Sequence, residues 1–105
     1  MTDRTARWIC ERAQMVVDLL RLGKSVAVVG AVGVGKSVVM NVAEQTIART
    51  ELSEQVTFVH AWEPGLRLSK GLVVIEAYPH QLDQLPAGFM IAPVLTYENY
   101  EVGAL

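Results

Sequence analysis

The sequence predicts an α/β domain with a mainly parallel sheet of four to five strands and two main helices. Its candidate strands are short, continuous apolar runs rich in β-branched residues, which is typical of parallel strands buried on both faces. Its two candidate helices, residues 5–22 and 37–48, repeat apolar residues at helical spacing. The length of 105 residues allows one domain. We therefore expect residues 1–105 to form a single small three-layer domain, made of an N-terminal helix (1–23), a strand–loop–helix unit (25–48) and the remaining strands (55–105).

The first predicted helix has one apolar face. This face consists of Trp8, Ile9, Met15, Val16, Leu19 and Leu20, with Arg12 on the same stripe. Gly23 is placed to end the helix, because glycine adopts the left-handed conformation that often follows the last turn. We predict Trp8 to be a core residue or an interface anchor, with stacking on adenine as the alternative.

A glycine-rich loop follows the predicted strand at residues 25–29. It reads Gly30-Ala31-Val32-Gly33-Val34-Gly35-Lys36-Ser37, the pattern G-x-x-x-x-G-K-S. Glycines at these places allow backbone conformations that residues with a Cβ resist, so the N–H groups of the loop can form a concave nest for an anion. Lys36 would reach the β- and γ-phosphates of a nucleotide, and Ser37 would offer its hydroxyl to Mg²⁺. The following helix, with Val38 in its first turn, would turn its positive end to the same phosphates. The alternative is a glycine-rich turn between two core elements.

Further strands are predicted at residues 55–60, 71–76 and 89–92, with 94–97 as a candidate fifth. Tyr78-Pro79 and Pro93 are expected to end the strands before them. Residues 80–88 are predicted to be a loop, with one helical turn as an alternative around Leu82 and Leu85. Two helices are few for covering both faces of a sheet, so we expect one face to be partly bare or covered by a partner.

Glu76 is the predicted acid of the site. It follows Leu72-Val73-Val74-Ile75, at the carboxyl edge where ligands bind in open α/β sheets. From there it could contact Mg²⁺ through water or polarise an attacking water, whereas the alternative is a strand-end acid that faces solvent. Lys36 and Glu76 are the predicted catalytic residues.

Other side chains are secondary candidates. Glu63 follows the second strand and could be a second acid near the γ-phosphate. Arg67 could sense phosphate or act on a neighbouring subunit, although a surface position is the alternative. His60 and His80 have no metal-ligand spacing with Cys10 or with each other, so we predict no zinc site.

Composition restricts the class of protein. The formal net charge is −2, which gives no direct evidence for binding nucleic acid or an anionic membrane. Cys10 is the single cysteine and cannot form an intramolecular disulfide, so a reducing compartment is expected. No apolar run approaches the roughly 18 residues of a transmembrane helix, and the polar N-terminus is unlike a signal peptide. We predict a cytoplasmic protein without a transmembrane segment.

The strand–loop–helix unit, residues 25–48, resembles that of the P-loop NTPases, whose phosphate-binding loop is called Walker A. The resemblance implies a nucleotide bound with Mg²⁺. A guanine reader usually carries an Asn-Lys-x-Asp motif, which the sequence lacks. We therefore expect ATP as the nucleotide and Mg²⁺ as the metal.

Other segments are similar to the secretion and conjugation ATPases. They are Leu22-Gly23-Lys24-Ser25-Val26, Gly-Lys-Ser-x-x-x-Asn from Gly35 to Asn41, Val56-Thr57-Phe58-Val59 and Gly71-Leu72-Val73-Val74-Ile75-Glu76. This resemblance implies a ring-forming, hexameric ATPase that drives substrate transfer, with Glu76 as its Walker B glutamate. The chain departs from the family at the acidic box, which reads His60-Ala61-Trp62-Glu63, and it has no histidine box.

The sequence therefore predicts an ATP-binding protein that hydrolyses ATP with Mg²⁺ in a homo-oligomer or larger assembly, such as one serving secretion or conjugative transfer. The first alternative is an adaptor or regulatory subunit that binds nucleotide with little or no hydrolysis. The second is an interaction domain in which the loop binds nothing.

Overall fold

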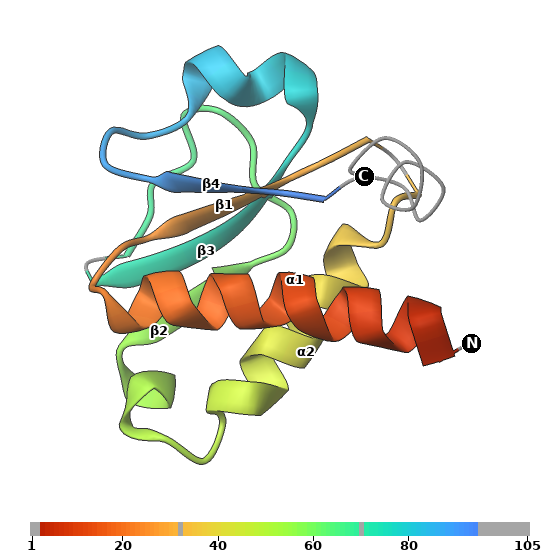
Figure 1. Ribbon diagram of the computed structural model, residues 1–105. Coiled ribbons are helices and arrows are strands. Elements are labelled where there is room, and N and C mark those ends of the chain that lie inside the picture. The colour runs from red at the N-terminus through yellow and green to blue at the C-terminus, as the bar shows by residue number, and fades with distance from the viewer. Residues whose placement is uncertain (1–2, 32, 70, 95–105) are drawn as a thin grey trace.

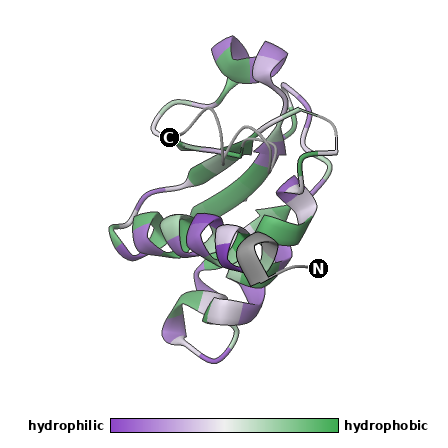
Figure 2. Ribbon diagram, turned by 45° about the vertical axis from the view of Figure 1, so that its right-hand side comes forward, coloured by the Kyte–Doolittle hydropathy of each residue, from purple (hydrophilic) through white to green (hydrophobic). Residues whose placement is uncertain are grey.

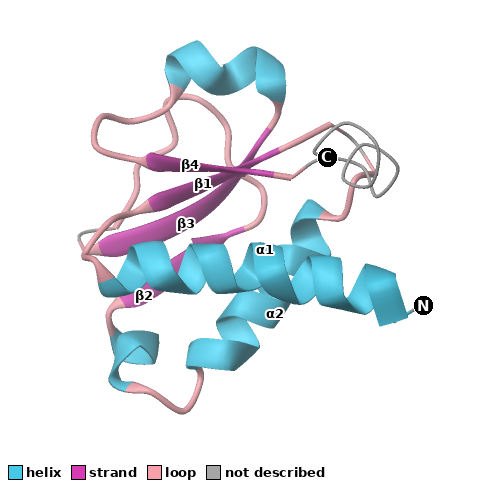
Figure 3. Ribbon diagram, in the orientation of Figure 1, coloured by secondary structure: helices cyan, strands magenta, loops and turns pink. Residues whose placement is uncertain are grey.

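A computed structural model of the chain describes residues 3–31, 33–69 and 71–94 (Figure 1). The elements in chain order are α1 (Asp3–Arg21), β1 (Val26–Val29), α2 (Lys36–Ile47), the 3₁₀ helix η1 (Glu51–Glu54), β2 (Val56–Val59), β3 (Leu72–Ala77), the 3₁₀ helix η2 (Pro79–Gln84) and β4 (Met90–Pro93). Figure 3 shows the two long helices beside the sheet; α2 lies in the connection from β1 to β2, and loops and the short helical turn η2 make the later connections. The predicted α/β class is confirmed.

The sheet has four strands in the order β2-β3-β1-β4, and every neighbouring pair is parallel. β1 lies inside the sheet between β3 and β4, and all four of its residues are buried. Its sequence, Val-Ala-Val-Val, suits that place because β-branched side chains pack well on a pleated surface. Parallel strands all end at one edge, so the residues that follow β1, β2 and β3 come together there.

Both long helices cover the same face of the sheet (Figure 1). Figure 2 shows the strands behind them as mainly hydrophobic ribbons. The buried residues on this side are Trp8, Ile9, Ala13, Val16, Val17 and Leu20 of α1, Val39, Met40, Ala43 and Ile47 of α2, and Val26, Val28, Val74 and Ala92 of the sheet. Trp8 is 3% exposed within this cluster, so its predicted core position is confirmed and its ring is not available to stack on a base. Gly23 lies two residues after the end of α1 and has φ +79°, as its predicted role in ending the helix requires.

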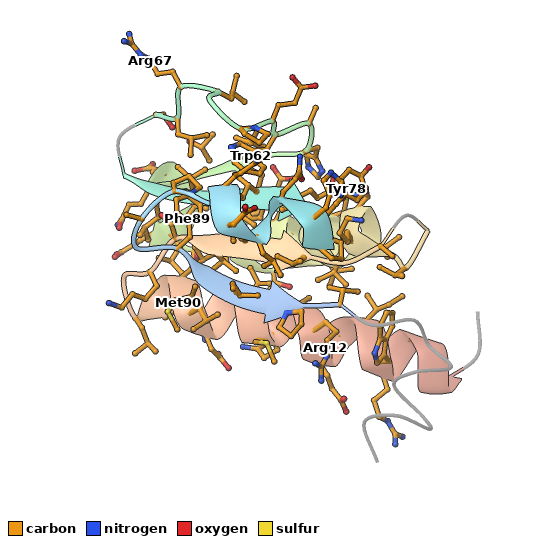
Figure 4. All side chains as sticks on the ribbon, turned by 90° about the horizontal axis from the view of Figure 1, so that it is seen from above. Arg12, Trp62, Arg67, Tyr78, Phe89 and Met90 are labelled. Atoms are coloured by element: carbon orange, nitrogen blue, oxygen red, sulfur yellow. The ribbon has the colours of Figure 1, made fainter. Side chains whose placement is uncertain are left out.

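The opposite face is covered by segments of the chain other than long helices. Its buried residues are Ala27, Val29, Val73, Ile75 and Ala77 of the sheet, together with Trp62. Leu68, Leu85 and Phe89 pack against them from the segments after β2 and around η2 (Figure 4). The molecule therefore has three layers, with helices on one side and loop segments with η2 on the other. Trp62, 5% exposed, folds back over the centre of this face. Ile91 of β4 is aligned with Ala27 on the same face and is 49% exposed, so the expectation of a partly bare face is confirmed at β4.

Strand β4 differs from its prediction at Pro93. This proline does not stop the strand but is its last residue, paired with Val29 of β1. Its lack of an N–H is tolerated because β4 is at the edge of the sheet, where one side of the strand has no partner in the described sheet. Val94 follows outside the strand, and the rest of the candidate fifth strand lies outside the described residues.

Residues 79–84 form η2, so the alternative of a helical turn around Leu82 is confirmed in 3₁₀ form. In the described ranges, no helix has both the length and the apolar character needed to span a membrane.

Candidate functional site

The glycine-rich loop joins β1 to α2 at the carboxyl edge of the sheet. Gly33 and Gly35 have φ of +81° and +98°, in the left-handed region that residues with a Cβ rarely adopt. The backbone conformation predicted from the glycine pattern is therefore confirmed at these two positions. Both glycines face the cavity described below.

Gly30 is required for a different reason from the one predicted. Its φ is not positive, so no special backbone conformation demands glycine there. A Cβ on Gly30 would instead lie 2.6 Å from the carbonyl oxygen of Val94 and 2.7 Å from Cγ2 of Val34. The end of β4 and the loop itself leave no room for a side chain, which the sequence could not indicate.

The first turn of α2 presents unpaired helical N–H groups to the loop. Val39 N–H makes a helical hydrogen bond to the carbonyl of Gly35 at 3.0 Å, so the N–H groups of Lys36, Ser37 and Val38 have no partner within the helix. Gly35 supplies no capping side chain, and this turn contains no acid. The positive end of the helix dipole is therefore available to an anion. Of the predicted phosphate-binding residues, Val32 lies outside the described residues.

Lys36 is folded over the loop and is 8% exposed. Its Nζ donates hydrogen bonds to the carbonyl oxygens of Gly30 at 2.7 Å and Ala31 at 2.8 Å. The same Nζ lies 4.4 Å from the centre of the Tyr78 ring. Burial lowers the pKa of Lys36 below its ordinary value of 10.5, and the charge of Glu76 partly opposes that shift.

Ser37 and Glu76 meet across two elements. The Ser37 hydroxyl donates a hydrogen bond of 2.7 Å to Oε1 of Glu76, although the two residues are 39 positions apart. Ser37 comes from the start of α2, and Glu76 comes from β3, where it is aligned with Val28 of the neighbouring β1. This contact places Glu76 beside the loop, as predicted, and not in the alternative position of an acid that only faces solvent.

A cavity of 650 Å³ opens beside these residues. One wall comes from the loop and α2, and the others come from the segments that follow β2 and β3. Its lining residues are Gly33, Gly35, Lys36, Ser37, His60, Ala61, Trp62, Glu63, Glu76, Tyr78, His80 and Gln81. Glu63, Lys36 and Glu76 therefore all line this cavity. That Glu63 is a second acid near the γ-phosphate stays a prediction.

Several lining residues were not predicted as part of the site. His60, Tyr78, His80 and Gln81 reach the cavity because they follow the carboxyl ends of β2 and β3. The signal available in the sequence was their position directly after apolar runs, since strand ends of a parallel sheet share one edge. Metal-ligand spacing alone could not have identified the two histidines.

Arg67 does not join the site. It is exposed, does not line the cavity and points away from the body of the domain in Figure 4. Its predicted role as an internal phosphate sensor is therefore not supported, and the surface alternative agrees with its position.

The oxygen atoms of Ser37 and Glu76 fit the chemistry of Mg²⁺, which prefers hard oxygen ligands. Within the described ranges, no three His, Cys, Asp or Glu side chains are grouped to hold a metal ion. A cation here would therefore take its remaining ligands from phosphate oxygens and water, as Mg²⁺ commonly does in nucleotide sites.

Comparisons of the chain with protein-family models, with curated proteins and with solved structures give no match. The class of the site therefore rests on its residues and their geometry.

Proposed function

We propose that this chain is a P-loop NTPase-like protein that binds ATP with Mg²⁺. The observation that carries the proposal is the hydrogen bond between Ser37 and Glu76, located beside the buried ammonium of Lys36. In this class of site, a loop serine and a strand-end acid hold the metal, and the loop lysine neutralises the phosphates. The described residues supply one group for each of these tasks.

Each group has a physical role in the proposed complex. Backbone N–H groups of the loop and of the first α2 turn would bind phosphate oxygens, aided by the helix dipole. Lys36 would hold the β- and γ-phosphates, while Glu76 would orient the Ser37 hydroxyl and the metal-bound water. Mg²⁺, when bound, neutralises charge on the phosphate oxygens.

Hydrolysis is part of the proposal, with Lys36 and Glu76 as its catalytic residues. An adaptor that binds ATP without turnover is the second candidate. It is favoured by one observation: Oε1 of Glu76 accepts the Ser37 hydroxyl, which directs this carboxylate to the metal position rather than to an attacking water.

We further propose that the protein works in the cytoplasm within an oligomeric assembly of the kind that serves secretion or conjugative transfer. The support is the sequence resemblance to the ATPases of those systems.

Binding is tested by thermal denaturation with ATP and Mg²⁺. A ligand at 100 times its Kd stabilises a protein by about 2.7 kcal/mol, which raises the Tm of a domain of this size by on the order of 10–20 °C. Lys36→Ala should remove that rise. Lys24→Ala is the matched control, because Lys24 is exposed and lies outside the cavity. If no nucleotide raises the Tm of the wild type at saturating concentration, the proposal is wrong.

Turnover is tested by phosphate release from ATP. An ATPase should release phosphate with Mg²⁺ and lose this activity in Glu76→Gln. Glu63→Gln, which changes the other acid that lines the cavity, tests whether Glu63 also contributes to turnover. If ATP binds but the wild type and Glu76→Gln release phosphate equally slowly, the adaptor candidate replaces the enzyme.

A further inference from the structure

An aromatic ring lies against the lysine of the site. Tyr78 follows Glu76 by two residues and lines the same cavity. The Lys36 Nζ lies 4.4 Å from the centre of the Tyr78 ring, within the range of a cation–π contact. Neither the glycine-rich pattern nor the strand-end acid accounts for a tyrosine here.

The turn after β3 restrains the backbone of Tyr78, and His80 stacks on its ring, so both contacts are independent of Lys36. The Tyr78 N–H donates a hydrogen bond of 2.9 Å to Oε1 of Gln81, whose side chain belongs to a residue only 9% exposed. Pro79 follows directly and begins η2, which restricts the backbone next to Tyr78. The Tyr78 ring also stacks on His80, with ring centres 5.7 Å apart and planes at 6°. The position of the ring beside the ammonium is therefore supported by contacts that do not involve Lys36.

Tyr78 belongs to the phosphate end of the site. Its ring contacts the ammonium that would bind the β- and γ-phosphates in the proposed complex. The base of the same nucleotide is separated from those phosphates by the ribose and the α-phosphate. Stacking of that base on Tyr78 would therefore conflict with the ring's contact to Lys36.

We propose that Tyr78 is a positioning residue for Lys36. Its ring holds the ammonium against the carbonyls of Gly30 and Ala31, so that the lysine is ordered before the triphosphate arrives. A lysine side chain otherwise loses much rotamer freedom when it is fixed, and ordering it beforehand strengthens binding. This inference rests on the proposed nucleotide site and adds to it a residue that acts through Lys36.

The test compares variants that keep or remove the ring face. Tyr78→Phe keeps the face and should bind ATP with Mg²⁺ as the wild type does. Tyr78→Leu removes it and should bind roughly 2- to 30-fold more weakly by calorimetry, the range of a cation–π contact converted to affinity. Pentafluorophenylalanine at position 78 has nearly the shape of Phe but a reversed ring charge distribution, so it should weaken binding as Leu does, even if the Leu variant fails to fold.

The contact itself is read separately in the free protein. The ε-methylene protons of Lys36 should show an upfield ring-current shift by NMR in the wild type and in Tyr78→Phe, and the shift should vanish in Tyr78→Leu. Equal affinity in the Leu, pentafluorophenylalanine and Phe variants would overturn the positioning role, and so would a loss shared by Tyr78→Phe. If the wild type does not bind ATP, the proposed function fails, while the NMR shift still decides whether Tyr78 orders Lys36.

Discussion

Replacing Gly33 by alanine separates the phosphate-binding role of the loop from its effect on stability. Gly33 has φ +81°, and an added Cβ would meet no atom within 4 Å, so the change introduces backbone strain without a clash. An L-residue in the left-handed region is disfavoured by about 1–2 kcal/mol. For a domain of about this size, each kcal/mol lowers the Tm by roughly 4–8 °C.

Gly65→Ala is the matched control. Gly65 has φ +90° with nothing within 4 Å of an added Cβ, and it does not line the cavity. Both variants should therefore lose similar stability, measured by thermal denaturation. Only Gly33→Ala alters the loop whose N–H groups would bind phosphate.

The two variants should differ in affinity for ATP with Mg²⁺. A hydrogen bond to a charged group contributes about 1.5–3 kcal/mol, so losing one in the loop should weaken binding by roughly 10- to 100-fold. Gly65→Ala should bind as the wild type does when both are titrated well below their Tm. Equal affinities for the two variants would refute the assignment of the loop as the phosphate site.

Gly30, Trp62 and Lys36 each make a contact that a single measurement can test. Gly30→Ala should lower the Tm more than Gly65→Ala, because its Cβ would lie 2.6 Å from the Val94 carbonyl oxygen; an equal Tm would contradict that packing. Trp62→Ala should reduce the free energy of unfolding by about 3–5 kcal/mol in urea denaturation, because the side chain is buried on the sheet face that lacks long helices; a loss under about 1 kcal/mol would show that this layer is loosely packed. Burial lowers the pKa of Lys36 in the free protein, whereas bound phosphates would favour its charged form, so affinity for ATP should fall as the pH rises, beginning below the ordinary lysine value of 10.5. A calorimetric pH series checks this, and a decline that begins only above 10.5 would contradict it.

The sequence carries enough information for the central unit of the fold. β1 is bounded by Gly23 and Gly30 and has an unbroken β-branched run, so its position followed from local pattern. The glycines, Lys36 and Ser37 occur at fixed spacing, and Glu76 ends an apolar run, so their approach at one edge followed from parallel topology.

The rest depended on tertiary contacts that no local pattern encodes. Trp62 covers a sheet face only because the segment after β2 turns back over β1 and β3. Pro93 belongs to β4 because that strand is at an edge, which depends on the order of the strands. Tyr78 became part of the site through the orientation of its ring toward Lys36.

In the proposed complex, Ser37 and Glu76 join a metal to a triphosphate held by the loop. Calorimetric titration of the wild type with ATP, in the presence and absence of Mg²⁺, measures this linkage. We expect saturable binding at one site that is tighter with Mg²⁺, and an advantage of Mg²⁺ that is lost in Ser37→Ala. Absence of saturable binding, or the same affinity with and without Mg²⁺, would show that the site does not bind a metal–nucleotide complex.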